Sequence, residues 1–181
     1  MSTLKVNRIE PRTGDSVEIL GFDGGKILQV VQAVKTDTWS TVSQDHVDVP
    51  GLSASITPSS VNSKILVQVD MHVGFSNYSG IFHLLRDDVK IYAGDGDLNR
   101  CGLFSNIFPQ VSGSNSPYNL VPVTANYLDN PQKNSSITYK ITGTSYNVGE
   151  TTYINRTDGN LNDPNRDGLT ASSITLMEVA G

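Results

Sequence analysis

The sequence has 181 residues, a formal net charge of −5 and a single cysteine. That length fits one domain with a short appendage, and such a domain buries enough surface to need no metal or disulfide for stability. One cysteine excludes an internal disulfide framework, and the acidic balance argues against nucleic-acid binding, which depends on clustered Lys and Arg. No apolar run has the length of a transmembrane helix, so we expect no membrane insertion.

Ser, Thr and Asn together account for 50 residues, whereas only 17% of the residues are charged. Strong helix formers are scarce, and β-branched and turn-forming residues take their place. Disorder is the competing interpretation of such a composition, but apolar residues alternate regularly along the chain. We therefore predict an all-β protein whose sheets carry hydroxyl and amide side chains on their surfaces.

The first 24 residues form a predicted unit of their own. Apolar residues alternate on either side of a turn, and so small a hairpin is marginal in water without partners. The Phe-Asp-Gly-Gly stretch at 22–25 reads as a joint. We place the boundary there, with an attachment and trimerisation segment at 1–24 and a head at 25–181. The N-terminus lacks the apolar core of a signal peptide, so we expect assembly in a cytoplasm.

The head contains strand-like runs separated by turn residues. The run 26–36 also fits a helical spacing, but its β-branched residues favour a strand partly buried on both faces. The run Lys64–Phe75 has the clearest alternation, and no convincing helix occurs. We predict a jelly-roll-like antiparallel β-sandwich. Its further strands are predicted at 39–49, 52–57, 80–86, 88–93, 101–108, 120–128, 136–144, 151–156 and 173–179.

The sequence carries no motif for zinc hydrolysis, acyl transfer or nucleotide binding, so we expect no catalytic residue, no cofactor and no enzymatic activity. Paired carboxylates could in principle cleave a glycosidic bond. The candidate pairs, Asp87 with Asp88 and Asp70 with Asp129, cannot be placed together from sequence. Most of the acidic residues read as ordinary surface charge.

Two acidic turns space oxygen ligands as calcium loops do. One contains Asp95 and Asp97, and the other contains Asp158, Asn160 and Asn162. Neither is flanked by helices, and the second lacks the glycine and the glutamate of an EF-hand loop. Solvated turns are the favoured interpretation, and we expect no metal site.

Two long loops, 106–119 and 157–170, are rich in Asn, Ser, Asp and Gly and suit weak polar contacts. Loops on a rigid sandwich commonly carry binding sites. Tyrosines could stack on sugar rings, although packing at sheet edges or between subunits is the more common role of any one of them. The candidate receptor residues are Tyr118, Asn115, Asn160 and Arg166.

Several motifs resemble the tail-fibre-like proteins of phages, especially those of marine and cyanobacterial hosts. The resemblance covers the first third of the chain and its last strand, and the middle contributes only LLRD at 84–87. The motifs are STLKVNRI at 2–9, PxTG at 11–14, VEI at 17–19, GKILQVVQ at 25–32, SITPSS at 55–60, SKILV at 63–67 and SITLME at 173–178.

The resemblance implies a virion appendage that is a homotrimer, with an N-terminal stalk or attachment segment and a β-sandwich head. The partners would be other virion proteins, through the N-terminal segment, and a host cell-surface glycan or receptor. Three copies winding together would bury apolar side chains of the N-terminal segment against one another. The predicted trimer contacts are Leu4, Val6, Ile9, Val17 and Ile19.

Two other functions remain open from the sequence. A head-attached fibre or a capsid decoration protein would share the trimeric sandwich and differ in where the N-terminus docks. A carbohydrate depolymerase is disfavoured, because no internal repeat of the kind that builds a long β-helix occurs. A short tail fibre that contacts the host surface is the preferred prediction.

Overall fold

The computed structural model describes residues 25–76, 80–95, 105–106, 118–159 and 163–181, and these residues contain strands and no helix. The all-β prediction is confirmed. The strands are β1 (Ile27–Lys35), β2 (Trp39–Thr41), β3 (Val47–Ile56), β4 (Lys64–Phe75), β5 (Gly80–Arg86), β6 (Val89–Ile91), β7 (Ser105–Asn106), β8 (Val121–Asp129), β9 (Ile137–Ser145), β10 (Thr152–Ile154) and β11 (Ser172–Val179).

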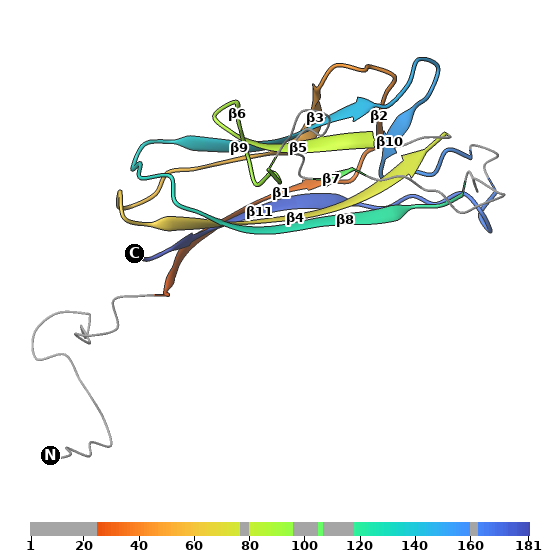
Figure 1. Cartoon of the computed structure of the whole chain (residues 1–181). Helices are drawn as coiled ribbons and strands as arrows, with labels where there is room; N and C mark the ends of the chain where they lie inside the picture. Colours follow the sequence, from red (N-terminus) through yellow and green to blue (C-terminus); the bar gives the residue numbers. More distant parts are fainter. Residues whose placement is uncertain (1–24, 77–79, 96–104, 107–117, 160–162) are drawn as a thin grey trace, which may run out of the picture.

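The strands form two antiparallel sheets that face each other (Figure 1). Sheet A has the order β1-β11-β4-β8. The last three residues of β4 also pair with the short strand β10, and β10 pairs with β2. Sheet B has the order β3-β9-β5, with β6 and β7 on the outer edge of β5. The longer strands alternate between the sheets along the chain, which is the winding of a jelly-roll sandwich. The predicted fold class therefore holds.

Alternation of apolar and polar residues decides which face each strand buries. Along β4, every second side chain from Ile65 to Val73 is buried, and the residues between them lie on the outer face of sheet A. Strand β9 contributes Tyr139 and Ile141 to the same interior. Because a strand places successive side chains on opposite faces, a single pairing register directs all the apolar side chains of β4 into the space between the sheets.

Two predictions about individual strands are wrong. The run 39–49 divides between β2 and β3, because hydroxyl-to-backbone hydrogen bonds at Ser43 turn the chain there, and β3 continues into the strand predicted separately at 52–57. Strand β1 is not buried on both faces: Val30 and Val34 are more than half exposed on the outer side of sheet A. Nothing among the described residues covers that side of β1.

Glu178 is a carboxylate enclosed in the sandwich, with 1% of its surface exposed. Its Oε1 accepts hydrogen bonds from the amide nitrogen (2.7 Å) and hydroxyl (2.6 Å) of Ser59, and its Oε2 accepts one from Nε2 of Gln29 (2.6 Å). Burial alone would raise the pKa of Glu178, but these hydrogen bonds lower it from 4.5 to about 2. The carboxylate joins β1, β11 and the β3–β4 connection.

The lowered pKa predicts a pH dependence of stability. The ionised carboxylate stabilises the fold fully above about pH 4.5, and that contribution is lost as the pH falls towards 2. We expect Glu178→Gln to lower the free energy of unfolding by about 2–3 kcal/mol at pH 7 and by much less at pH 2. Urea unfolding at both pH values measures this. Asp70→Asn, on the exposed face of β4, is the control, and equal losses for E178Q at both pH values would contradict the assignment.

Candidate functional site

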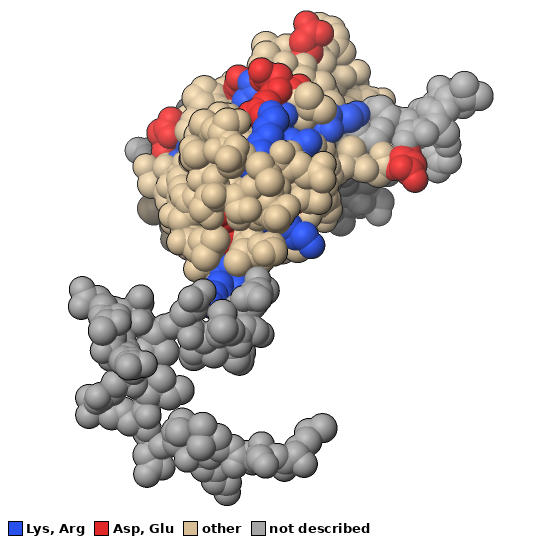
Figure 2. Space-filling view, turned by 90° about the vertical axis from the view of Figure 1, so that its left-hand side faces the viewer, with Lys and Arg blue, Asp and Glu red and all other residues tan. Residues whose placement is uncertain are grey.

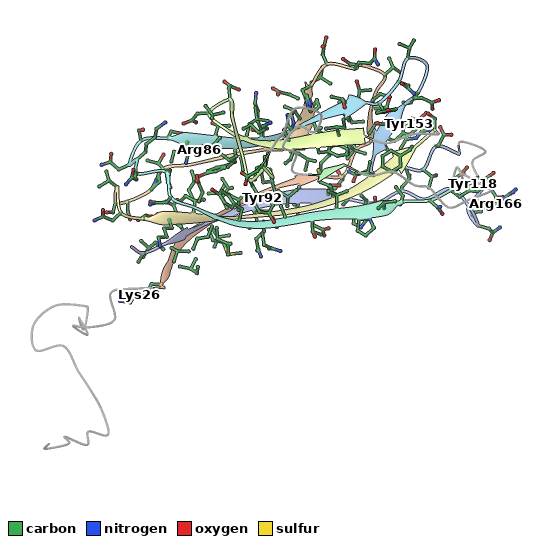
Figure 3. All side chains as sticks on the ribbon, viewed as in Figure 1. Lys26, Arg86, Tyr92, Tyr118, Tyr153 and Arg166 are labelled. Carbon is green, nitrogen blue, oxygen red and sulfur yellow. The ribbon has the colours of Figure 1, made fainter. Side chains whose placement is uncertain are left out.

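The two ends of the sandwich differ in what they carry. The first and last described residues meet at one end, where the amide of Ala180 donates a hydrogen bond to the carbonyl of Lys26 (2.9 Å). Tyr118, Tyr153 and Arg166 lie at the opposite end (Figure 3). We call the end at Lys26 and Ala180 the terminal end, and the end at Tyr118, Tyr153 and Arg166 the distal end. The described residues of the predicted binding loop 157–170 lie at the distal end.

Asn155 holds the distal loop where it leaves β10. Its side chain is fully buried, and its amide nitrogen donates to the carbonyls of Lys35 (2.8 Å) and Asp37 (3.0 Å). Its Oδ1 accepts a hydrogen bond from the hydroxyl of Ser172 (2.5 Å), and its backbone has a φ of 63°. The left-handed conformation suits Asn better than most residues. One side chain therefore fixes the loop to the end of β1 and the start of β11.

The loop is also closed by its own hydrogen bonds. Asp163 accepts at Oδ1 from the amide of Asn165 (2.9 Å) and at Oδ2 from Nε of Arg166 (2.8 Å). These two contacts lower the pKa of Asp163 from its ordinary value. The amide of Thr157 donates to the carbonyl of Gly168 (3.2 Å), which ties the two ends of the loop together. The charged side chains are therefore held in place.

Two of the four candidate receptor residues are brought together. The guanidinium carbon of Arg166 lies 5.3 Å from the ring centroid of Tyr118, within cation–π range. The same ring packs against the backbone of Gly159, where a Cβ would lie 2.5 Å from Cε1 of Tyr118. The other two, Asn115 and Asn160, lie outside the described residues. So do the five predicted trimer contacts, all within 1–24.

A hollow of about 650 Å³ opens beside this loop. On one side the guanidinium of Arg156 lies 4.5 Å from the ring centroid of Tyr153 and donates to the carbonyls of Thr157 and Asp158. Carboxylates, hydroxyls and one exposed leucine meet in the hollow, a mixture that suits a small ligand with many hydroxyl groups. The lining residues are Thr38, Arg156, Thr157, Gly159, Asp163, Pro164, Asp167, Gly168 and Leu169.

Sequence reasoning identified the loop but missed Arg156 and Asp167. Arg156 directly follows the fully buried Asn155 at the end of β10, so it is the first side chain free to face the hollow. That position, the last residue of the strand predicted at 151–156 and beyond the end of β10, was the available signal. Asp167 lies inside the predicted loop, and nothing in its spacing separates it from the neighbouring acids.

The acidic turns are only partly described. Asp97, Asn160 and Asn162 lie outside the described residues. Among the residues that are described, no group of three or more His, Cys, Asp or Glu side chains could hold a metal ion. The carboxylate of Asp163, next to the second turn, is occupied by Arg166 and Asn165.

The candidate carboxylate pairs do not form a glycosidase-like centre. Asp87 and Asp88 make the tip of the β5–β6 hairpin, both with positive φ, and bind Lys133 (2.7 Å) and Lys140 (2.8 Å). Asp129 lies opposite Ile65, five residues along β4 from Asp70. At about 3.4 Å per residue the second pair is roughly 17 Å apart, well beyond the ~5–9.5 Å that glycosidases use.

Two of the three histidines stack on each other beside sheet B. The rings of His46 and His83 stack with their centroids 3.6 Å apart. Burial, then the charges of His46 and Lys90, lower the pKa of His83 to about 4. His72, by contrast, belongs to sheet A, and its Nδ1 lies 3.0 Å from the carbonyl of Ala171. Both stacked rings are therefore expected to be neutral at neutral pH.

No protein-family model matches this chain, and no curated protein does so either. Among solved structures, a chain of infectious bursal disease virus, Gx strain, is matched over 97% of this chain and 44% of its own length, with 10% identity and a TM-score of 0.38. A chain of the T13 particle of that virus is matched over 97% and 43%, with 10% identity and a TM-score of 0.41. This chain thus spans less than half the length of those viral chains, and the low TM-scores assign it neither a family nor a function.

Within the described residues, no helix has the length and apolar character that crossing a membrane requires.

Proposed function

We propose that this chain is a structural protein of a phage virion, a short trimeric tail fibre whose sandwich head contacts a glycan on the host surface. The main support is that the N-terminal segment and the hollow lie at opposite ends of the head. The segment 1–24 enters at the terminal end, beside Lys26, and the hollow lies at the distal end (Figures 1 and 3). A head attached through its N-terminus would therefore present the loop 157–170 outward.

The chemistry of the hollow supports a glycan as the ligand. Sugars offer hydroxyl groups that donate to carboxylates and accept from guanidinium groups, and Asp167 and Arg156 supply these two kinds of partner. Tyr118 and Tyr153 are each held by a cation–π contact, at 5.3 Å and 4.5 Å. Aromatic rings fixed in this way give contact area at little cost in side-chain entropy.

The winding of the strands adds support at the level of fold. Jelly-roll sandwiches occur in viral capsid and lectin domains, which present loops from the ends of two rigid sheets. Fold alone does not define function, so this support is by analogy. The trimer belongs to the same proposal, with Leu4, Val6, Ile9, Val17 and Ile19 as its contacts.

Adsorption of the purified protein to host cells tests the proposal. We expect Arg166→Ala and Tyr118→Ala each to weaken adsorption about tenfold or more, as for residues that carry much of the binding energy of an interface. Lys133→Ala is the control, because Lys133 forms an exposed ion pair with Asp87 away from the distal loop. Thermal unfolding of each variant checks that the fold is intact. Unchanged adsorption of both variants would refute binding through this loop.

Gold-labelled antibodies on intact particles test the location of the protein. Labelling at the tail is the expected result. Labelling spread over the capsid shell would contradict a tail fibre and favour a capsid decoration protein.

A further inference from the structure

The outer face of sheet A has a band of exposed apolar side chains at the terminal end. One row runs across all four main strands, with Val30 opposite Met177, Met177 opposite Leu66 and Leu66 opposite Leu128. Val30 is 57% exposed and Leu128 is 49% exposed. The apolar band comprises Ile27, Leu28, Val30, Leu66, Leu128, Met177 and Val179.

The apolar band ends abruptly at a polar row. In the next row of outward-facing residues, Nε2 of Gln32 donates to Oγ1 of Thr175 (2.8 Å) and Nε2 of Gln68 donates to Oδ1 of Asn126 (2.9 Å). These side chains satisfy one another across the strands, as surface residues do. Beyond this row Val34 is aligned with the polar Ser173 and Asp70, so the described outer face of sheet A is contiguously apolar only beside the terminal end, next to the point where 1–24 joins the head. Contiguous exposed apolar surface on a folded domain marks a contact site.

The charge around the apolar band is positive. Lys26 precedes its first residue, and Lys64 lies opposite Val179 at its margin. In the view of the terminal end, most of the surface is tan, and the acidic side chains gather mainly at its upper margin (Figure 2). An occupant with apolar side chains and acidic flanks would match this surface.

We propose that residues 15–23 of the same chain, with the sequence DSVEILGFD, pack across the apolar band. The segment carries three acidic residues and no basic ones, and its last residue is four positions from Ile27. In an extended segment Glu18, Leu20 and Phe22 share one face. Phe22 and Leu20 contact the apolar band, and Glu18 pairs with Lys64.

The segment and its connection to β1 are long enough to cross the four main strands of sheet A. Gly25 has a φ of 82° with open space around it, so the chain can turn back at this position. The four main strands of sheet A span about 14 Å at roughly 4.8 Å per gap, and the segment from 18 to 22 covers about 13 Å when extended. The opposite face of the segment, with Val17 and Ile19, stays free for contacts between copies. The inference does not depend on the proposed function, because a head can bind its own segment in any oligomeric state.

Disulfide trapping in the full-length chain tests the inference, in a background carrying C101S. We expect F22C with M177C to oxidise to an intrachain disulfide, visible as a faster monomer band on a non-reducing gel. F22C with V89C is the control, because Val89 is 62% exposed but belongs to β6 of sheet B. A disulfide between chains would assign the apolar band to a second copy and overturn the proposal. Cross-linking no better than that of the control would also overturn it.

Limited proteolysis without introduced cysteines gives an independent result. Packing on the apolar band should protect the bond after Glu18 from a glutamate-specific protease. We expect V30S combined with L128S to raise cleavage there about tenfold, while V34S leaves it unchanged. Val34 is a matched control, since it lies on the same strand with similar exposure but beyond the polar row. Equal cleavage in all three proteins would refute the contact.

Discussion

Replacing Asp129 by alanine is expected to lower the free energy of unfolding by about 3–5 kcal/mol, because it leaves a partly buried arginine without its partner. Asp129 is 3% exposed. Its two carboxylate oxygens accept hydrogen bonds from Nη1 of Arg86 at 2.9 and 2.8 Å, and Oδ2 also accepts one from the hydroxyl of Tyr139 at 2.6 Å. Burial and the bond to Asp129 raise the pKa of Tyr139. The cluster joins β8 of sheet A to β5 and β9 of sheet B.

Urea unfolding at neutral pH measures the effect. Asp48→Ala is the matched control, since Asp48 forms an exposed ion pair with Lys140 (2.8 Å), and such pairs contribute about 1 kcal/mol or less. Tyr139→Phe removes only the hydroxyl and should cost less than D129A. A D129A protein within about 1 kcal/mol of the wild type would show that the cluster does not hold the sheets together.

Replacing Asn155 by alanine is expected to destabilise the fold by about 3 kcal/mol and to release the distal loop. The change removes three side-chain hydrogen bonds and leaves the carbonyls of Lys35 and Asp37 without their donor, at about 1 kcal/mol or more each. It also places alanine at a φ of 63°, which disfavours residues with a Cβ. We therefore expect adsorption to host cells to fall together with stability.

The variant Asn155→Gly separates the two causes. Glycine accepts the left-handed backbone but lacks the amide, so N155G should recover about 1 kcal/mol relative to N155A and no more. Urea unfolding gives the stabilities, and ¹H–¹⁵N spectra show whether the loop signals move. N155A with wild-type stability would contradict the role of this side chain.

Strict alternation was enough to predict most of the strands. The strand predicted at 64–75 is β4 to the residue, β9 is shifted by one residue at each end from 136–144, and β11 begins one residue before the predicted 173. Alternation failed at 39–49, where hydrogen bonds within two residues of Ser43 interrupt an otherwise strand-like run. Local bonds of this kind compete with sheet pairing and leave no periodic signal.

The sequence could not reveal which strands lie together. Strands β4 and β5 follow each other along the chain, yet they belong to different sheets, so His72 and His83 do not share a sheet. The anchoring role of Asn155 was equally hidden, because its acceptors are the carbonyls of residues about 120 positions earlier in the chain. The loop range was predictable from composition, whereas the residues that position it depend on long-range contacts.

The place of β11 in sheet A has a consequence for the order of folding. Among the described strands, the last, β11, lies between the first, β1, and β4, so neither β1 nor β4 has this partner until residue 179 is synthesised. Contacts this distant in sequence slow folding, and unpaired strand edges invite association with other chains. A nascent sandwich therefore keeps two open strand edges until β11 has been synthesised. Copies of the chain should assemble correctly only after β11 has paired with both neighbours.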